Sequence, residues 1–335
     1  MTLAQLRCLL AVVDAGSNIT LAASRVNATQ SAMSKQLKQL EEQLALKLFV
    51  RRGRHLERLT PAGEEIVERV RIIVGEADNI RALAANRHKS TGGSLHIETT
   101  HIQAQFVLPP VLARLRARFP QVNISLGFGA DFAAVGQRNV DVDMSIFSTD
   151  GRVPGGGLAI PLYQWDPVAI VPRHHTLAAA RATPSLAELA AYPLLSYDTS
   201  HTAALGIART FVEEGLSPRF AYTVRDGAVI KAAVREGLGV GLLAEMALDP
   251  TADSDLHAIA LAGLLPRCTT WAVLRQDRVM RDYTLVLLNL LSGLSVSTIQ
   301  RLAQEGSVSL NKAPVPMWSE VNQKIAGAKT RNVAA

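Results

Sequence analysis

T-Q-S-A-M-S-K-Q-L-K-Q-L-E-E-Q-L, residues 29–44, is the stretch that decides the fold of the N-terminal part of the chain. The threonine at its start suits a helix N-cap, because its hydroxyl accepts a hydrogen bond from a backbone N–H of the first turn. Apolar side chains then recur at helical spacing, at Met33, Leu37, Leu40 and Leu44. The stretch therefore predicts a helix over Gln30–Gln43 that buries one face and exposes a polar, basic one.

Two shorter helices are predicted before it, over residues 3–14 and Leu21–Val26, and Asn27-Ala28 forms the turn that follows them. A short helix, a tight turn and a second helix with a polar start are typical of a helix-turn-helix. The sequence L-F-V-R-R-G-R-H-L at 48–56 then predicts a hairpin with a basic turn, which is called a wing when it lies beside a recognition helix. Arginines in such a turn can lie along a phosphate backbone.

The distribution of charge supports the same interpretation. The chain has 335 residues and a net charge of +6. Residues 1–90 hold 14 Lys and Arg against 9 Asp and Glu, a net charge of +5, which leaves +1 for the rest. A basic domain joined to a nearly neutral one is typical of a protein whose first domain binds nucleic acid. The alternative is a solvated surface on which the charges are unevenly spread.

After the wing, Thr60 and Pro61 predict the start of a long helix, since threonine caps helices and proline suits the first helical position. Its apolar residues follow a heptad-like seam: Ile66, Val70, Ile73, Val74, Ala77, Ile80 and Leu83. A long helix with one apolar seam usually pairs with another copy of itself. We therefore expect a DNA-binding domain at 1–60, a dimerising linker helix at 61–90 and a flexible boundary at K-S-T-G-G-S, 89–94.

Beyond residue 91 the pattern changes to short apolar strands separated by helices, which is typical of parallel α/β units. The expected strands include Leu95–Thr100, Val122–Phe128 and Val240–Ala244. The predicted fold class is thus α/β with an all-α N-terminal part. Residues 301–335 have weak periodicity, two prolines and a basic, Ala-rich end, and we expect a poorly ordered tail there.

Several classes of protein are excluded by the sequence. Cys8 and Cys268 cannot form a disulfide scaffold, and without a C-x-x-C or a Cys/His cluster we expect no metal site. No signal peptide is present, and the most apolar late stretch, Tyr283–Leu294, is too short to span a bilayer. There is also no G-x-S-x-G, P-loop or paired His/carboxylate motif. We therefore expect a cytoplasmic protein with no cofactor, no membrane partner and no enzymatic activity.

Within residues 1–65 a specific set of positions matches a known family: Leu6, Ala22-Ala23, 29–37, Leu40-Glu41, Leu48-Phe49, Arg51 and L-T-P-A-G at 59–63. In this order and spacing they resemble the LysR-type transcriptional regulators. The resemblance implies a winged helix-turn-helix, a linker helix and a two-lobed effector-binding domain like a type 2 periplasmic binding protein, over 91–300. Lobe I would span 91–163 and 268–300, and lobe II 164–267. It also implies a homotetramer built as a dimer of dimers, with promoter DNA as partner and RNA polymerase as a further candidate.

The chemistry of the matching positions predicts the DNA contacts. N–H groups at the start of a helix favour a phosphate, and an amide such as that of Gln30 suits the edge of adenine. The lysines suit phosphates or guanine, and the arginines of the wing suit the backbone. The predicted DNA-binding residues are Thr29, Gln30, Ser31, Ser34, Lys35, Lys38, Arg51, Arg52 and Arg54. The alternative is an ordinary polar helix face followed by a solvated arginine turn.

H-I-E-T-T-H-I-Q-A-Q-F-V-L-P, residues 96–109, resembles one branch of the family, the CysB-like regulators of cysteine biosynthesis and sulfur-source use. A-Y-P-L at 191–194, V-I-K at 229–231 and G-L-G-V-G at 237–241 extend the resemblance. It implies target genes of sulfur assimilation or organosulfur use, and a small anionic effector such as sulfate, acetylserine or a sulfur metabolite. The implied effector-binding residues are Thr99, Thr100, Ile102, Gln103, Thr149 or Ser148, and Thr202.

These residues also suit an anion on chemical grounds. Thr99, Thr100 and Gln103 follow a predicted strand, and ligands of open α/β sheets collect at the carboxyl ends of strands. Their hydroxyl, amide and backbone N–H donors can hold an anion without a formal positive charge. Ile102 departs from the branch, which has threonine there, so one hydroxyl donor is lost. Three alternatives stay open: threonines that only cap a helix, an unrelated effector such as an aromatic acid, and a solute-binding or enzymatic α/β protein.

Overall fold

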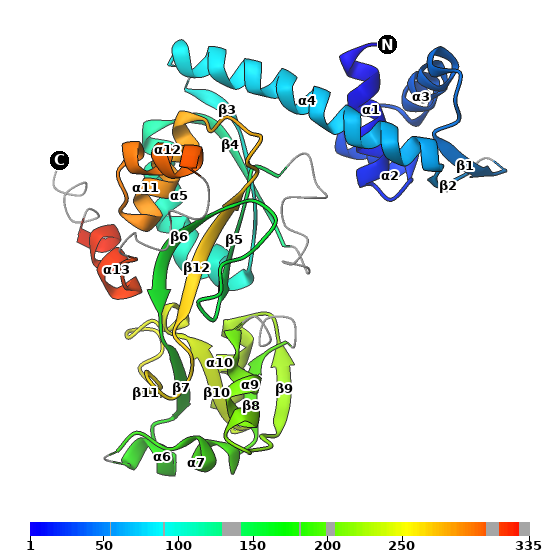
Figure 1. Cartoon of the computed structure of the whole chain (residues 1–335). Helices are drawn as coiled ribbons and strands as arrows, with labels where there is room; N and C mark the ends of the chain where they lie inside the picture. The colour runs from blue at the N-terminus through cyan, green and yellow to red at the C-terminus, as the bar shows by residue number, and fades with distance from the viewer. Residues whose placement is uncertain are drawn as a thin grey trace. The chain divides into compact units, whose positions relative to one another are not determined.

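The computed structural model of the chain describes residues 1–53, 55–89, 91–128, 142–180, 182–198, 205–305 and 315–327 (Figure 1). They form two compact units. The first contains the described residues up to 89 and the segment Asp277–Arg281, and the second contains the others from Thr91 onward. No single helix in these ranges is both long and apolar enough to cross a bilayer; two sharply bent helix pairs reach that length and apolarity only when joined.

The first unit consists of helices and one hairpin: α1 (Leu3–Asp14), α2 (Ile19–Arg25), α3 (Gln30–Leu44), β1 (Phe49–Arg52), β2 (His55–Leu59) and α4 (Pro61–Arg87). Side-chain oxygens of Asn18, Thr29 and Thr60 each accept a hydrogen bond from a backbone N–H in the first turn of α2, α3 and α4. Pro61 occupies the first turn of α4, where a missing N–H costs nothing. The predicted helix-turn-helix, wing and linker helix are therefore confirmed.

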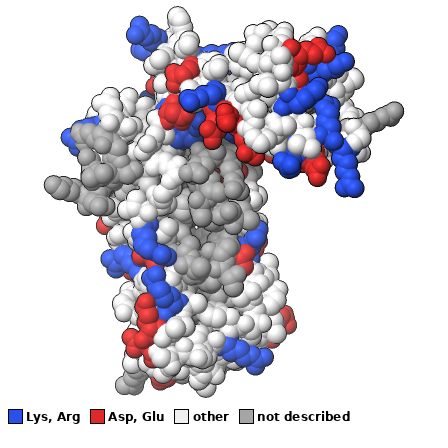
Figure 2. All heavy atoms as spheres, turned by 45° about the vertical axis from the view of Figure 1, so that its right-hand side comes forward, with Lys and Arg blue, Asp and Glu red and all other residues white. Residues whose placement is uncertain are grey.

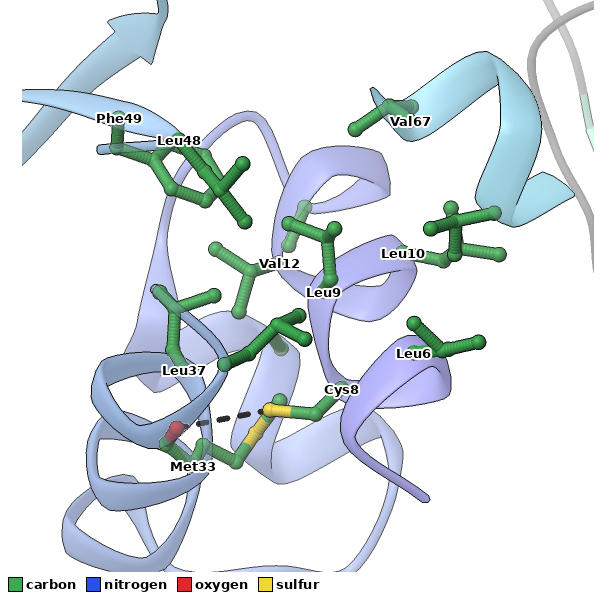
Figure 3. Packing of buried hydrophobic residues seen from close by; sticks show 14 of the residues in the cluster. Leu6, Cys8, Leu9, Leu10, Val12, Met33, Leu37, Leu48, Phe49 and Val67 are labelled. Carbon is green, nitrogen blue, oxygen red and sulfur yellow. Dashed lines mark hydrogen bonds between the residues drawn. The ribbon is translucent and has the colours of Figure 1, made fainter. Parts of the chain in front are cut away.

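The core of the first unit is apolar and connects its helices to the wing (Figure 3). Leu9 of α1, Leu37 of α3 and Leu48, just before β1, are fully buried. Burying a leucine side chain stabilises the fold by about 1.5–3 kcal/mol. Met33 and Leu40 are buried with them, so the apolar stripe predicted for α3 holds the helix in this core.

Cys8 belongs to the same core. Its side chain is buried, and its thiol donates a weak hydrogen bond to the Met33 carbonyl oxygen at 3.5 Å (dashed line in Figure 3). Burial raises the pKa of the Cys8 thiol to about 11, so nearly all of it is protonated at neutral pH. Because the thiolate is the reactive form, the position of Cys8 suits packing and not redox sensing.

A buried carboxylate fixes the wing to α3. Glu41 is 2% exposed, and its Oε1 accepts a hydrogen bond from the Leu48 N–H at 3.0 Å. Its Oε2 accepts one from the Arg51 guanidinium at 3.0 Å, with Lys47 Nζ 3.5 Å away. A buried charge is tolerated only when it is paired and hydrogen-bonded. These contacts therefore determine where the hairpin leaves the helix, although nothing in the sequence pattern marked Glu41 for this role.

The linker helix α4 has two apolar faces where the sequence predicted one seam. Val67, Val70 and Val74 are buried in the core of the first unit, which α1 shares. The residues that expose a large part of their apolar side chains are Ile72, Ile73, Ile80 and Leu83. The predicted seam is therefore divided: its valines complete the core, and its outer residues form an exposed apolar surface.

Polar contacts hold α4 in place. Arg71 lies 2.6 Å from the Asp14 carboxylate of α1, and both side chains are mostly buried. Further along, the Asn79 amide donates a hydrogen bond to the Asp277 carbonyl oxygen at 2.6 Å. The Asn79 side-chain oxygen also accepts a hydrogen bond from the Val279 N–H at 2.9 Å. The segment Asp277–Arg281 therefore packs on α4 and belongs to the first unit.

The second unit is built on two five-stranded sheets. The first has the order β4-β3-β5-β12-β6, with β3 (Gly92–Thr99), β4 (Gln121–Gly127), β5 (Met144–Thr149), β6 (Leu158–Trp165) and β12 (Cys268–Leu274). The second has the order β11-β7-β10-β8-β9, with β7 (Pro167–Pro172), β8 (Leu194–Tyr197), β9 (Phe220–Val224), β10 (Val240–Ala244) and β11 (Leu256–Ala260). The chain passes from one sheet to the other at Asp166, between β6 and β7, and returns between β11 and β12. Each sheet therefore forms one lobe.

Both sheets are mixed, which the sequence pattern did not predict. As expected, β3 pairs in parallel with β4 and β5, and β8 with β9 and β10. However, β12 is antiparallel to β5 and β6, and β7 is antiparallel to β10 and β11. The antiparallel pairs involve the four strands that connect the lobes. These strands follow no crossover helix, so the rule that a strand-helix-strand unit is parallel does not apply to them.

Helices cover the two sheets. α5 (Leu108–Arg118), α11 (Asp282–Ser292) and α12 (Val296–Glu305) belong to lobe I. α6 (Thr176–Ala179), α7 (Leu186–Ala190), α9 (Ile207–Glu213) and α10 (Gly227–Arg235) belong to lobe II. A π-helix, η1 (Gln103–Val107), precedes α5, and a 3-10 turn, η3 (Glu245–Ala247), follows β10. Strands β8, β10 and β12 are buried along their whole length, as sheets covered on both faces are.

The end of the chain is more ordered than the sequence predicted. α12 extends to Glu305, and α13 (Trp318–Gly327) follows with Trp318, Val321 and Ile325 buried. The prediction of a poorly ordered tail over 301–335 is therefore wrong for 301–305 and 315–327, and its other residues lie outside the described ranges. A helix as short as α13 has little stability by itself, so only packing on the rest of the fold could reveal it.

Replacing the buried carboxylate should loosen the wing. We expect Glu41→Ala to lower the free energy of unfolding by about 1–3 kcal/mol, because the Leu48 N–H loses its acceptor and Arg51 loses its partner. Glu42→Ala is the matched control, because Glu42 is exposed and its ion pair with Lys38, at 3.7 Å, is exposed too. An exposed ion pair adds little stability, so this substitution should change the free energy of unfolding by less than about 0.5 kcal/mol. Urea unfolding followed by circular dichroism measures both, and equal effects would contradict the role given to Glu41.

Candidate functional sites

The start of α3 presents polar groups to solvent. Thr29 caps the helix by accepting a hydrogen bond from the Ala32 N–H at 3.2 Å, and its hydroxyl lies 3.2 Å from that of Ser31. Gln30 and Ser31 are exposed. The unpaired N–H groups of the first turn and the positive end of the helix dipole lie at the same place. This arrangement can hold a phosphate or meet the edge of a base.

Cations on α3 and the wing surround that helix start. Lys35, Lys38 and Arg52 are exposed, while Ser34 is half-buried. Basic side chains gather on one side of the first unit, at the upper right of Figure 2. The predicted residue Arg54 lies outside the described ranges. The basic face expected from the sequence is therefore present on α3 and on the described part of the wing.

Besides the predicted contact with DNA, Arg51 has a structural role, because it pairs with Glu41. Its guanidinium nitrogen lies 3.0 Å from Glu41, yet 39% of the side chain is exposed. Part of its charge is therefore compensated within the protein, and the exposed part can still contact a phosphate. We expect Arg51 to contribute less than Arg52 to a salt-dependent attraction, because a charge already paired releases fewer counterions.

A hollow of about 410 Å³ lies in the first unit between the turn after α1, the start of α3 and β2. Its lining residues are Gly16, Ser17, Asn18, Ile19, Thr20, Gln30, His55 and Leu56. The amide of Gln30 thus shares one recess with the wing residue His55. A polar recess between a recognition helix and a wing can receive a polyanion backbone.

In the second unit, the predicted effector residues lie at the carboxyl end of β3 but differ in their partners. The Thr99 hydroxyl is fully buried and donates a hydrogen bond to the Ile146 carbonyl oxygen of β5 at 2.9 Å. The Thr100 hydroxyl oxygen accepts a hydrogen bond from the Gln103 N–H at 3.4 Å, at the start of η1. Ile102 is 5% exposed and contributes apolar surface only. Thr99 therefore joins two strands, whereas Thr100 keeps its hydrogen for another partner.

Ser148 and Thr149 end the neighbouring strand β5, and both are engaged. The Thr149 hydroxyl donates to the Arg152 carbonyl oxygen at 2.6 Å and accepts from the Trp271 indole at 2.9 Å. The Ser148 hydroxyl lies 2.8 Å from that of Thr270. The two alternatives of the sequence analysis thus lie side by side, each in a hydrogen-bonded network. The third predicted segment, with Thr202, lies outside the described ranges.

Buried aromatic residues and Thr270 complete this network, and they were not among the predicted effector residues. The Trp165 indole N–H lies 3.2 Å from the hydroxyls of both Ser148 and Thr270. Tyr163, which is fully buried, donates a hydrogen bond to Oε1 of Gln103. Burial raises the pKa of Tyr163, so its hydroxyl stays protonated at neutral pH. Tyr163 and Thr270 lie in strands whose pattern indicates only burial, so no local signal could have identified them.

Two side-chain donors remain after these bonds are assigned. Counting only the described residues, the Thr100 hydroxyl hydrogen and the Gln103 amide nitrogen have no hydrogen-bond acceptor. Both groups belong to the first turn after β3. Such neutral donors can hold a small anion. The same ranges contain no group of three or more His, Cys, Asp or Glu that could hold a metal ion.

An ion pair joins the two lobes beside this turn. Asp150, which follows β5, lies 2.6 Å from Arg209 of α9 and 2.6 Å from Arg152. Burial by itself raises the pKa of Asp150, but hydrogen bonds and charge from the two arginines outweigh burial and hold it below its usual range. Asp150 is therefore ionised at neutral pH, and the pair holds lobe I against lobe II.

A second contact between the lobes involves η1 directly. Lys231 of α10 places Nζ 5.2 Å from the centre of the Phe106 ring and 2.7 Å from the Asp253 carboxylate. Phe106 lies three residues after Gln103, so a shift of the turn that carries Gln103 also moves a contact with lobe II. The cations near the site, Lys231 and Arg209, are both paired with carboxylates.

The sequence matches two family models. One is "Bacterial regulatory helix-turn-helix protein, lysR family", over residues 3–64, and the other is "LysR substrate binding domain", over residues 88–294. The first covers the helix-turn-helix and the wing, and the second covers both lobes. The residues between the two matches, 65–87, lie in α4.

Similar proteins span nearly the whole chain. The HTH-type transcriptional regulator SsuR of Burkholderia cenocepacia is 33% identical over 294 residues, 87% of this chain and 94% of that protein. The HTH-type transcriptional regulator CysB of Haemophilus influenzae is 32% identical over 288 residues, 84% and 87% of the two chains. Among solved structures, the cofactor-binding domain of the Cbl transcriptional regulator is 32% identical with a TM-score of 0.58, and the match covers 65% of this chain and 96% of that domain.

The adjacent threonines should respond differently to the same substitution. Thr99→Val leaves the buried Ile146 carbonyl oxygen without its donor, so we expect the free energy of unfolding to fall by about 1–3 kcal/mol. Thr100→Val removes only a long hydrogen bond and should cost less than about 1 kcal/mol. Urea unfolding of the two variants makes the comparison, and a larger loss for Thr100→Val would show that the hydroxyls are assigned wrongly.

Proposed function

The chain belongs to the LysR family of bacterial transcriptional regulators, and we propose that it controls genes of sulfur assimilation, cysteine biosynthesis or organosulfur utilisation. In this proposal α3 and the wing bind operator DNA, and a small sulfur-related anion or an acetylserine-type molecule binds between the lobes. The identity of about one third to SsuR and CysB over most of the chain supports the branch. The polar turn after β3, with Thr100 and Gln103, supports the class of effector.

The DNA-binding part is supported by exposure and charge. Gln30 and Ser31 offer hydrogen bonds at the open start of α3, while Lys35, Lys38 and Arg52 offer unpaired or weakly paired cations. The exposed apolar surface of α4, with Ile80 and Leu83, suits pairing with the α4 of a second copy. Such a dimer would place two recognition helices in successive major grooves, and two dimers would form a tetramer.

The effector part is supported by the kind of donors left at the site. The hydroxyl of Thr100 and the amide of Gln103 carry no formal charge, and the nearby cations Arg209 and Lys231 are paired with Asp150 and Asp253. The observation that carries the proposal is therefore a turn with several neutral donors and no free cation among the residues described around it. Binding there would shift the equilibrium between two arrangements of the assembly, and so the bend of the DNA.

This function requires binding and no bond making or breaking. We assign the protein no catalytic role, place it in the cytoplasm with the promoter DNA, and name RNA polymerase as a further candidate partner.

One observation favours a second candidate effector. Ile102 is buried beside Gln103 where the branch has threonine, and this suits an effector with an apolar part, such as an aromatic acid.

Specific DNA binding should depend on the start of α3. We expect Gln30→Ala with Ser31→Ala to weaken binding to a duplex enriched from random sequence by the native chain about tenfold or more, because base-edge contacts are lost. Binding to unrelated DNA and the dependence on salt should not change, since no charge is removed. Gln43→Ala, on an exposed position near the end of the same helix, is the control. Gel-shift titrations compare the native chain, the double variant and the control. If the double variant bound the enriched duplex as tightly as the native chain, the proposed DNA interface at the start of α3 would be rejected.

Effector class can be tested by the thermal unfolding of the intact chain. Sulfate, thiosulfate, O-acetylserine, N-acetylserine, adenylyl sulfate and a sulfonate are the test ligands, with sodium chloride at matched ionic strength as the control. A ligand at 100 times its Kd stabilises by about 2.7 kcal/mol, and Thr100→Val should lose most of this shift. A shift with benzoate and with none of the sulfur compounds would favour the aromatic-acid candidate.

A further inference from the structure

The C-terminal helix α13 is anchored to lobe I beside β6 (Figure 1). The Gln164 N–H of β6 donates a hydrogen bond to the Pro316 carbonyl oxygen at 2.8 Å, just before the helix begins. At its other end, the Arg114 guanidinium of α5 donates to the Lys324 carbonyl oxygen at 3.0 Å and to that of Ile325. Since a helix leaves its last carbonyl groups without partners, Arg114 completes its C-terminus. The helix is therefore held at both ends.

The first residue of α13 contacts the network of the effector site. Trp318 is 7% exposed, and its ring lies 5.2 Å from that of Tyr163, tilted by 49°. Tyr163 is fully buried, and its hydroxyl donates to Oε1 of Gln103. Three residues from three parts of the chain thus form one connected row, from the C-terminal helix to the turn after β3.

The hydrogen bond from Tyr163 decides which way the Gln103 amide points. An amide carries an acceptor on one side and two donors on the other, and a half-turn exchanges them. With Oε1 accepting the hydrogen bond from the Tyr163 hydroxyl, the amide nitrogen lies on the side turned away from Tyr163. The reversed amide would instead present its oxygen, which repels an anion.

We propose that α13 is part of the effector-sensing apparatus, with Trp318 and Tyr163 acting as positioning residues. Trp318 holds the Tyr163 ring, and the Tyr163 hydroxyl keeps the Gln103 amide nitrogen turned towards the anion. This inference rests on the proposed function, because it assumes that an anion binds at Gln103. It adds a role for residues 315–327, which lie beyond the matched effector-binding domain.

Sulfate and N-acetyl-L-serine are the probes, each titrated by calorimetry into the intact native chain and its variants at constant ionic strength. Tyr163→Phe keeps the ring and removes only the hydroxyl, so we expect its affinity to fall about tenfold. Trp318→Ala should also weaken binding, while Trp318→Phe, which keeps a ring, should stay close to the native value. The double variant Tyr163→Phe with Trp318→Ala should bind about as tightly as Tyr163→Phe alone, because both act through one hydroxyl.

Hydrogen exchange tests the same coupling without a ligand. We expect Trp318→Ala to raise deuterium uptake in peptides that cover residues 100–107, while the exposed control Lys324→Ala leaves it unchanged. If the native chain binds a probe and Tyr163→Phe binds it equally well, the inference is overturned while the effector site stands. If the native chain binds neither probe, the proposed effector class fails. The uptake over 100–107 then tests only the coupling of α13 to this turn: a rise supports the coupling, and no change overturns it and the inference with it. Should Trp318→Ala fail to fold, Tyr163→Phe decides the affinity test, and its own uptake over 100–107 replaces that of Trp318→Ala.

Discussion

A polar side chain that is buried at the carboxyl ends of β3 and β5 needs a hydrogen-bond partner, and this requirement determines which donors of the second unit are left for another molecule. Thr99 satisfies it with the Ile146 carbonyl oxygen, Thr149 with Arg152 and Trp271, and Gln103 with the Tyr163 hydroxyl. Once these bonds are formed, the donors left over belong to one turn. The protein's own hydrogen bonds thus leave only the Thr100 hydroxyl hydrogen and the Gln103 amide nitrogen without an acceptor among these groups, and for that reason we propose them as the effector-binding donors.

The same rule, applied to charge, separates the two units. In the first unit Lys35, Lys38 and Arg52 remain exposed, whereas Arg51 and Lys47 lie beside the buried carboxylate of Glu41. In the second unit, Arg209 and Lys231 are matched by Asp150 and Asp253. The nearly zero net charge of the second unit therefore reflects pairing of charges, and not their absence. A surface of free cations attracts a polyanion over a distance, whereas neutral donors recognise a small anion by geometry.

Pairings between distant parts of the chain were beyond the sequence pattern. The antiparallel course of β12 could not be predicted, because its partner β5 precedes it by more than a hundred residues and no turn motif connects them. Glu41 resembles any glutamate of a helix surface until the hairpin folds over it. The helix α13 is too short to be stable alone, so its spacing of apolar residues became informative only once β6 was present to bury them.

Residues 29–44 determined by themselves the cap, the buried stripe and the polar face of α3, because a helix is specified by contacts within a few residues. The wing and the start of α4 followed for the same reason, and so did the positions of Thr99, Thr100 and Gln103 after a strand. Only the tertiary structure decided which of these three residues keeps a side-chain donor without an acceptor. That outcome depends on Ile146 and Tyr163, and residues so far apart in sequence meet only when the sheet has formed.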